Sequence, residues 1–127
     1  MRLLLDTHVL LWWLTDDRRL GAQARAQIAN ADNSVYVSAA SAWEIAIKRA
    51  LGKLRAPPGL DGTVEEAGFE KLAIGFQHAE RAGALPPLHS DPFDRMLIAQ
   101  ALLEDLVLVT ADKSFAEYGV ELGFAGE

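Results

Sequence analysis

Four acidic residues occupy positions from which carboxylate chemistry could be built: Asp6, Glu44, Asp94 and Asp112. Asp6 follows an apolar run at residues 3–5, and Asp112 comes two residues after a second apolar run at 106–110. Because ligands of parallel α/β sheets bind outside the carboxyl ends of the strands, both acids are expected at one edge of a sheet. Carboxylates that converge from distant segments repel one another unless a cation lies between them. Ligation by oxygen alone favours Mg²⁺ or Mn²⁺ over zinc.

Each of these acids also has a purely structural interpretation. Asp6 and Asp112 could cap the helices that follow them, and Glu44 could face solvent within a helix. Asp91 precedes a proline, as an N-cap residue often does, so we assign it to capping first and to the site second. Asp94 would then lie in the first turn of that helix, where the helix dipole favours an acid. The coincidence of all four favours a common site over four separate structural roles.

Neighbouring polar residues could support such a site. Thr7 directly follows Asp6, and Thr110 precedes Asp112 by two residues. Both hydroxyls are expected to hydrogen-bond the carboxylates without contacting a bound metal. Arg95 adjoins a third acid, so it could steady a carboxylate or contact a substrate. We interpret His8 and His89 as packing or loop residues rather than as acid–base groups.

The overall charge of the chain is negative. It has 12 Lys and Arg against 18 Asp and Glu, with a formal net charge of −6 and a pI near 5.0, so bulk electrostatics disfavours binding to nucleic acid. Four basic residues nevertheless fall within eight positions: Lys48, Arg49, Lys53 and Arg55. This local density could bind phosphates, or it could complement the dipole at the end of a helix. A divalent cation held by the acids would also offset part of the negative charge.

Length and composition restrict the class of protein. The chain has 127 residues, 50% hydrophobic and 24% charged, which is typical of one globular domain spanning residues 1–127. The absence of cysteine excludes disulfides, thiol catalysis and Cys-ligated metals, and three histidines are too few for a His-rich metal site. No apolar run approaches the length of a membrane span, and Asp6 interrupts what would be the apolar region of a signal peptide. We therefore expect a soluble, cytoplasmic protein.

Apolar periodicity predicts that strands and helices alternate. Strands are expected at residues 3–5, 35–37, 69–74, 106–110 and 120–124, and helices at 9–14, 21–31, 39–51, 60–67, 76–84, 93–103 and 114–118. Ser38 is the expected cap of the helix at 39–51. The apolar positions expected to face the core from this helix are Trp43, Ile47, Ala50 and Leu51. The alternation predicts an α/β sandwich with a mainly parallel sheet.

Four motifs occur in an order that is similar to one known family. They are LLLDTH at residues 3–8, SAASAWEI at 38–45, DPFDRMLIAQA at 91–101 and LVTAD at 108–112. Together they resemble the PIN domain of the VapC toxins of type II toxin–antitoxin modules, and the similarity covers nearly the whole chain. The resemblance implies a three-layer α/β/α sandwich.

The resemblance also implies an activity and a site. The metal-binding acids of the family correspond to Asp6, Glu44, Asp94 and Asp112, with Asp6 and Asp94 holding the main cation. The implied activity is that of an endoribonuclease dependent on Mg²⁺ or Mn²⁺, in which water activated by the metal attacks the phosphodiester. The products would carry 5′-phosphate and 3′-hydroxyl ends. Family members are commonly dimeric, also form larger toxin–antitoxin assemblies, and are neutralised by a VapB-type antitoxin.

Two tryptophans could take part in such assemblies. Trp12 and Trp13 cannot both point into the core from one helix, so one is expected at the surface or at the edge of the core. A surface tryptophan would suit contact with an antitoxin or a second subunit.

Two other functions are compatible with a sequence of this length. One is a phosphoacceptor receiver domain, which requires adjacent acids after the first strand and an aspartate at the end of the third. Here Asp6 is followed by Thr7 and His8, and Glu44 falls within a helix, so the acids are wrongly spaced for a receiver. The other is a noncatalytic domain of the same fold that binds RNA or protein, which the complete set of four acids disfavours.

Overall fold

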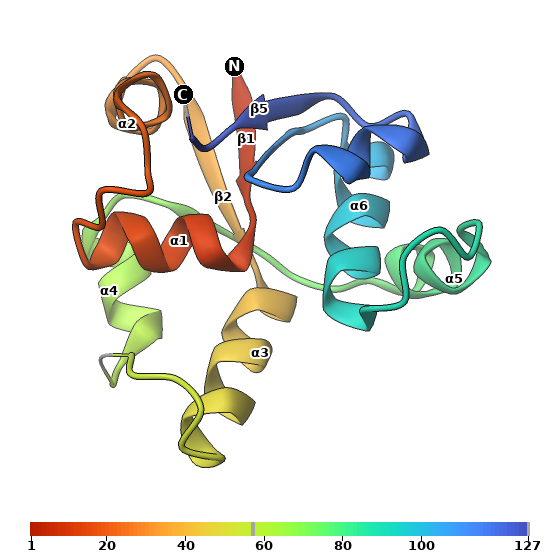
Figure 1. Cartoon of the computed structure of the whole chain (residues 1–127), viewed down its shortest axis with the longest axis horizontal. Helices are drawn as coiled ribbons and strands as arrows, with labels where there is room; N and C mark the ends of the chain where they lie inside the picture. Colours follow the sequence, from red (N-terminus) through yellow and green to blue (C-terminus); the bar gives the residue numbers. More distant parts are fainter. Residues whose placement is uncertain (57, 127) are drawn as a thin grey trace.

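Five parallel strands form the central sheet of the protein. The computed structural model describes residues 1–56 and 58–126, and its strands pair in the order β3-β2-β1-β4-β5 (Figure 1). Their bounds are β1 Arg2–Leu5, β2 Ser34–Ser38, β3 Glu70–Leu72, β4 Val107–Thr110 and β5 Leu122–Phe124. The expected parallel sheet is confirmed, although β3 and β5 are shorter than the runs predicted at 69–74 and 120–124.

Helices cover both faces of this sheet. Their bounds are α1 Thr7–Leu14, α2 Ala22–Ala29, α3 Ala39–Ala50, α4 Leu60–Glu66, α5 Phe76–Ala84 and α6 Pro92–Glu104, with a 3₁₀ helix, η1, at Lys113–Tyr118. Residues of α1, α2 and α4 join one apolar cluster and residues of α5 and α6 join a second, and Figure 1 shows these groups on either side of the strands. The expected three-layer α/β/α sandwich is therefore confirmed.

The central strand β1 connects the two clusters. Leu3 and Leu5 belong to the first cluster and Leu4 to the second, because successive side chains of a strand point to opposite faces. All three are fully buried, as is typical of a parallel strand covered on both sides.

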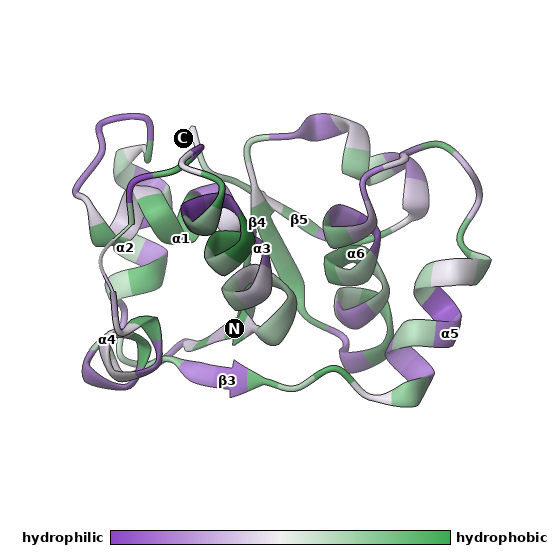
Figure 2. Cartoon of the chain, turned by 90° about the horizontal axis from the view of Figure 1, so that it is seen from below, coloured by the Kyte–Doolittle hydropathy of each residue, from purple (hydrophilic) through white to green (hydrophobic). Residues whose placement is uncertain are grey.

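The edge strand β3 has a different character. Figure 2 shows β3 as hydrophilic and β4 as hydrophobic, in keeping with the exposed Glu70 and Lys71 on β3. Charged side chains on an edge strand disfavour its pairing with another chain. In the described part of the chain no helix has the length and apolarity that a membrane crossing requires.

The inward face of α3 differs from the predicted one. Trp43 and Leu51 are each 62% exposed, whereas Ser41, Glu44 and Ile45 are buried. The helix packs against both α1 and α6, and this arrangement turns the Ser41–Glu44–Ile45 side inward. The apolar spacing alone was misleading because the buried stripe contains a carboxylate. Tertiary packing, rather than apolar periodicity, therefore sets the rotation of α3.

The two tryptophans of α1 lie at the edge of the core, which is one of the two positions expected. Trp12 and Trp13 are both half-buried, and both pack against the first apolar cluster. Neither ring is therefore a fully exposed anchor.

A buried polar network links α3 to α6. The hydroxyl of Ser38 donates to Gln100 Oε1 (2.6 Å) and accepts from the backbone N–H of Ala40, which confirms Ser38 as the cap of α3. Gln100 is fully buried on α6, and its Nε2 donates to the carbonyl of Ala73 (3.3 Å). These contacts hold the start of α3 against α6 and so limit how the acid of α3 can move relative to the acid of α6.

Replacing Gln100 with leucine should destabilise the protein. The Gln100→Leu change leaves the Ser38 hydroxyl and the Ala73 carbonyl without this partner, so the free energy of unfolding should fall by about 1–3 kcal/mol. Urea denaturation followed by circular dichroism measures this change. The matched control is Gln77→Leu on the exposed surface of α5, which should change stability by less than about 0.5 kcal/mol. Equal effects of the two substitutions would contradict a structural role for the network.

Candidate active site

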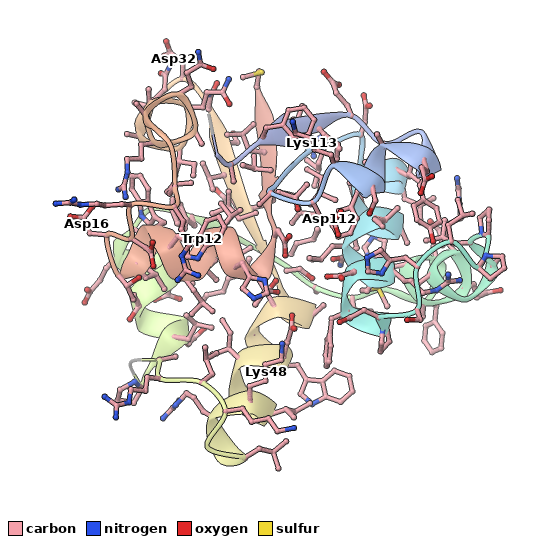
Figure 3. All side chains as sticks on the ribbon, viewed as in Figure 1. Trp12, Asp16, Asp32, Lys48, Asp112 and Lys113 are labelled. Carbon is pink, nitrogen blue, oxygen red and sulfur yellow. The ribbon has the colours of Figure 1, made fainter. Side chains whose placement is uncertain are left out.

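The four acids singled out from the sequence line one cavity. Its volume is about 780 Å³, and its walls include Asp6, Glu44, Asp94 and Asp112, together with Asp91. Figure 3 shows Lys48 of α3 and Asp112 after β4 at the edges of this region. The cavity lies at the carboxyl ends of β1 and β4, where ligand sites of parallel α/β sheets are found.

Asp6 is held at the end of β1 by a hydroxyl from the neighbouring strand. It occupies the N-cap position of α1, yet its side chain makes no capping hydrogen bond. Instead, Thr110 Oγ1 donates to Asp6 Oδ2 (2.7 Å) and also accepts from the backbone N–H of Asp112 (3.0 Å). Burial raises the pKa of the Asp6 carboxyl, and the hydrogen bond from Thr110 partly opposes this effect. Thr110 therefore connects the segments that carry two of the acids.

Glu44 is buried, so the alternative interpretation that it faces solvent is wrong. Only 3% of the residue is exposed, and Lys48 Nζ lies 2.6 Å from Glu44 Oε2. This contact raises the pKa of the Lys48 ammonium. The second carboxylate oxygen, Oε1, is buried and has no hydrogen-bond partner among the described residues. A buried unpaired carboxylate oxygen is costly, so this atom is a natural ligand for a cation in the cavity.

Asp91 and Asp94 have distinct roles at the start of α6. Asp91 Oδ1 accepts from the backbone N–H groups of Phe93 (2.8 Å) and Asp94 (3.1 Å), so Asp91 caps the helix as expected. Burial, together with the charges of Asp6 and Asp91, raises the pKa of Asp94 to about 7. Asp94 therefore carries much of the electrostatic cost of gathering these acids.

Asp112 serves both the cavity and η1. Its Oδ1 accepts from the backbone N–H of Ser114 (3.0 Å) and from the hydroxyl of the same residue, so it caps η1. The hydrogen bonds from Ser114 lower the pKa of Asp112. Its Oδ2 remains directed toward His89 Nε2, 3.5 Å away.

His89 is a loop residue, as expected, and it also lies at the site. Its Nε2 is 3.6 Å from Asp94 Oδ2 and similarly close to Asp112, and its ring packs edge-on against Phe115. The available signal was its position two residues before the capping Asp91, which fixes the direction of the loop. The cavity is also lined by His8 and by two cations that the sequence did not single out, Arg19 and Lys113.

Arg95 organises a loop rather than a carboxylate. All the hydrogen bonds of its guanidinium within the described structure go to backbone carbonyls, those of Ala82, Gly83, Leu85, Pro86 and His89. The expectation that Arg95 steadies a carboxylate is therefore wrong, and Arg95 fixes the loop that carries His89; its contact with substrate stays a prediction.

The expected partner of Thr7 needs correction, and the predicted basic cluster is divided by the structure. The Thr7 hydroxyl donates to Ser41 Oγ (2.9 Å) instead of a carboxylate, because the side chain is buried between α1 and α3. Of the predicted basic cluster, Lys48 lines the cavity, but Arg49, Lys53 and Arg55 are exposed and do not. Arg49 lies in the last turn of α3, and Lys53 and Arg55 follow the helix; binding of phosphates by these three stays a prediction.

The acids share the cavity without yet meeting at one point. Among residues 1–56 and 58–126, no three His, Asp or Glu side chains are placed as ready ligands of a single ion. Burial is the main cause of the raised pKa values of Asp6 and Asp94; the charge of Glu44 adds to the first, and those of Asp6, Asp91 and Glu44 add to the second. The chemistry of the donor set, oxygen atoms with one of them buried and unpaired, fits a hard divalent cation.

The fold and site define the class of protein. The sequence pattern of the PIN domain matches residues 3–121, and the chain belongs to this family. The strand order also differs from the 2-1-3-4-5 order of receiver domains, which removes the phosphoacceptor alternative.

Particular relatives resemble the chain along most of its length. It is 30% identical over 113 residues to Ribonuclease VapC22 of Mycobacterium tuberculosis, covering 87% of this chain and 86% of the relative. Its fold is similar to that of VapBC2 from Rickettsia felis bound to a DNA fragment of its promoter, with a TM-score of 0.73 and 16% identity. It is also similar to DNA-bound VapBC from Salmonella typhimurium, with a TM-score of 0.72 and 20% identity. Each of these structural matches covers 98% of both chains.

Metal-free protein should lose stability as pH rises from about 4 to about 7. Asp94 has a higher pKa in the folded chain than in the unfolded one, so the folded state binds more protons across this interval. The Asp94→Asn variant lacks this proton uptake, so its melting temperature in EDTA should exceed that of the wild type by more at pH 7 than at pH 4. The exposed control Asp32→Asn should give the same small difference at both pH values. A pH-independent effect of Asp94→Asn would contradict the raised pKa.

Replacing Arg95 with lysine should loosen the loop that carries His89. Lysine keeps the charge but loses the planar fork that reaches several carbonyls, so the free energy of unfolding should fall by about 2 kcal/mol. Urea denaturation and limited proteolysis within residues 83–90 measure the effect, and the exposed Arg81→Lys serves as control. Unchanged stability combined with weakened RNA binding would support the interpretation of Arg95 as a substrate contact.

Proposed function

We propose that this protein is a metal-dependent endoribonuclease and the toxin of a type II toxin–antitoxin module. The observation that carries the proposal is that Asp6, Glu44, Asp94 and Asp112 all line one cavity, with Glu44 Oε1 buried and without a hydrogen-bond partner among the described residues. A family relative bears the name Ribonuclease VapC22, which supports RNA as the substrate. The target RNA is then cut at internal phosphodiester bonds.

The cofactor proposed for this site is Mg²⁺ or Mn²⁺. Asp6 and Asp94 would hold it, with Glu44 and Asp112 completing the set of oxygen ligands. When bound, such an ion polarises the phosphate and lowers the pKa of the attacking water. Products with 5′-phosphate and 3′-hydroxyl ends are expected, because no nucleophile from the protein or the RNA is required.

The residues of the chain prepare this chemistry in separate ways. Thr110 fixes the Asp6 carboxylate, and Lys48 fixes one oxygen of Glu44 while leaving the other directed into the buried region. His89 lies between the carboxylates of Asp94 and Asp112 and limits their separation. Catalytic groups held in advance by such contacts need less reorganisation during the reaction.

The proposed protein partner is a VapB-type antitoxin that inhibits the toxin, and the toxin itself is proposed to be a homodimer in the cytoplasm. The support for the antitoxin partner is the similarity in fold to toxins solved within VapBC complexes. A noncatalytic domain that only binds RNA or protein is the remaining alternative, and the cleavage experiment below distinguishes it.

Purified, antitoxin-free protein should cut cellular RNA at discrete positions in Mg²⁺ or Mn²⁺ and not in EDTA. The Asp94→Asn variant should lower the cleavage rate at least about a hundredfold, because it removes a charged ligand from the site. Mapping of the product ends measures the chemistry, and 5′-hydroxyl ends would contradict attack by water as described.

The matched control is Asp32→Asn, on an exposed turn far from the cavity, as Figure 3 shows. It should cut RNA like the wild type. A second measurement is independent of activity: Mg²⁺ should raise the melting temperature of the wild type and of Asp32→Asn more than that of Asp94→Asn. Metal-independent cleavage, or RNA binding without any cleavage, would overturn the proposal.

A further inference from the structure

Three cations lie in the walls of the acidic cavity, and they differ in their surroundings. Lys48, Arg19 and Lys113 come from α3, from the α1–α2 connection and from the start of η1, respectively. Lys48 Nζ lies 2.6 Å from Glu44 Oε2, so its charge is already paired with an acid of the cavity. Arg19 and Lys113 are each positioned by neighbouring side chains that leave at least one N–H donor free.

Arg19 is held by an acid and an aromatic ring. Its Nε and Nη2 contact the carboxylate of Asp17 (3.1 and 2.7 Å), and its guanidinium carbon lies 5.2 Å from the centre of the Trp12 ring. Nη1 makes no hydrogen bond within the described part of the chain, and 69% of the side chain is exposed. Asp17 and Trp12 therefore orient the guanidinium while one edge of it stays open to a ligand.

Lys113, at the start of η1, also packs against an aromatic ring. It follows Asp112 directly, and its Nζ lies 5.2 Å from the centre of the Phe124 ring. Within residues 1–56 and 58–126 this ammonium forms no ion pair or hydrogen bond. Arg19 packs on the ring of Trp12. Figure 3 shows Trp12 and Lys113 on separate segments around the region of Asp112. A cation above an aromatic face keeps its outward N–H donors for an anion.

The charge balance of the cavity no longer opposes an anionic ligand once metal is present. Five carboxylates and three Lys or Arg side chains line it, which leaves a formal excess of two negative charges. One divalent cation cancels this excess among the lining residues, while Asp17, which pairs with Arg19 outside the lining, adds one negative charge nearby. The loaded cavity would then present Arg19 and Lys113 to a phosphodiester chain with little net repulsion, although the protein as a whole is acidic.

We propose that Arg19 and Lys113 bind backbone phosphates of the RNA on segments beside the scissile bond, so that substrate crosses from the α1–α2 connection to the start of η1. This inference rests on the proposed ribonuclease function and names the phosphate contacts of that site. It assigns these contacts to Arg19 and Lys113 in preference to the exposed Arg49, Lys53 and Arg55. Contacts of this kind are independent of base sequence.

The test is binding of a fluorescein-labelled, single-stranded oligoribonucleotide of mixed sequence, measured by anisotropy in Mg²⁺ at several salt concentrations. The parent is Asp94→Asn, which retains Arg19 and Lys113, blocks cleavage and removes one carboxylate charge from the cavity, so that a smaller negative excess remains although its hold on Mg²⁺ is weaker. Into it we introduce Arg19→Ala and Lys113→Met separately. Each should weaken binding about tenfold and reduce the slope of log affinity against log salt by about 0.7, the contribution of one phosphate contact on a single strand.

Matched controls separate phosphate binding from loss of structure. Arg18→Ala removes an exposed arginine beside Arg19 that does not line the cavity, and Lys71→Met removes a lysine on the remote edge strand β3. Both should bind within twofold of the parent. Arg19→Lys keeps the charge, so it should retain the salt slope, and melting temperatures report any unfolding.

The outcomes distinguish this inference from the proposed function. If Arg19→Ala and Lys113→Met bind like the parent, or if Lys53→Ala and Arg55→Ala lower the salt slope in their place, the inference is overturned. Cleavage of RNA by the wild type under the same conditions would leave the proposed function standing. If the wild type does not cut RNA and the parent does not bind it, both fail together.

Discussion

Repulsion between buried carboxylates is the constraint on which much of this structure depends. Asp6 is almost wholly buried, Glu44 is buried with one oxygen unpaired, and Asp94 has its pKa raised to about 7. No such gathering of acids is favourable in the folded chain by itself. The surrounding contacts therefore oppose an electrostatic cost, and a bound cation would remove it.

The contacts that oppose this repulsion come from every layer of the fold. Thr110 on β4 donates to Asp6 on the neighbouring strand, and Lys48 neutralises one oxygen of Glu44 a helical turn away. His89 reaches Asp94 and Asp112 from a loop that Arg95 fastens through backbone carbonyls. A polar cluster of this kind is stable only while its partners are present, which is why distant residues matter for the site.

The parallel sheet provides the framework for these contacts. Because β1 and β4 are adjacent and run in the same direction, the residues that follow them are brought to the same edge. The two apolar clusters bury β1 on both faces, and this packing holds the carboxyl end of the strand, where Asp6 follows, in a fixed position. Arg19 and Lys113, the cavity cations with free donors, lie on the α1–α2 connection and on η1. These segments come after β1 and β4 in the chain, so the same two strands also place the cations.

The sequence by itself determined the alternation of strands and helices, the parallel sheet, the caps at Ser38 and Asp91, and the four acids as a set. These features are local, since they depend on periodicity, capping chemistry and residues that directly follow strands. Tertiary structure decided the rotation of α3, which buries Glu44 and exposes Trp43, because packing against α1 and α6 outweighs apolar spacing. It also decided the partners of Thr7 and Arg95 and the approach of His89 and Arg19 to the cavity. Such contacts join segments far apart in the chain, and no local pattern encodes them.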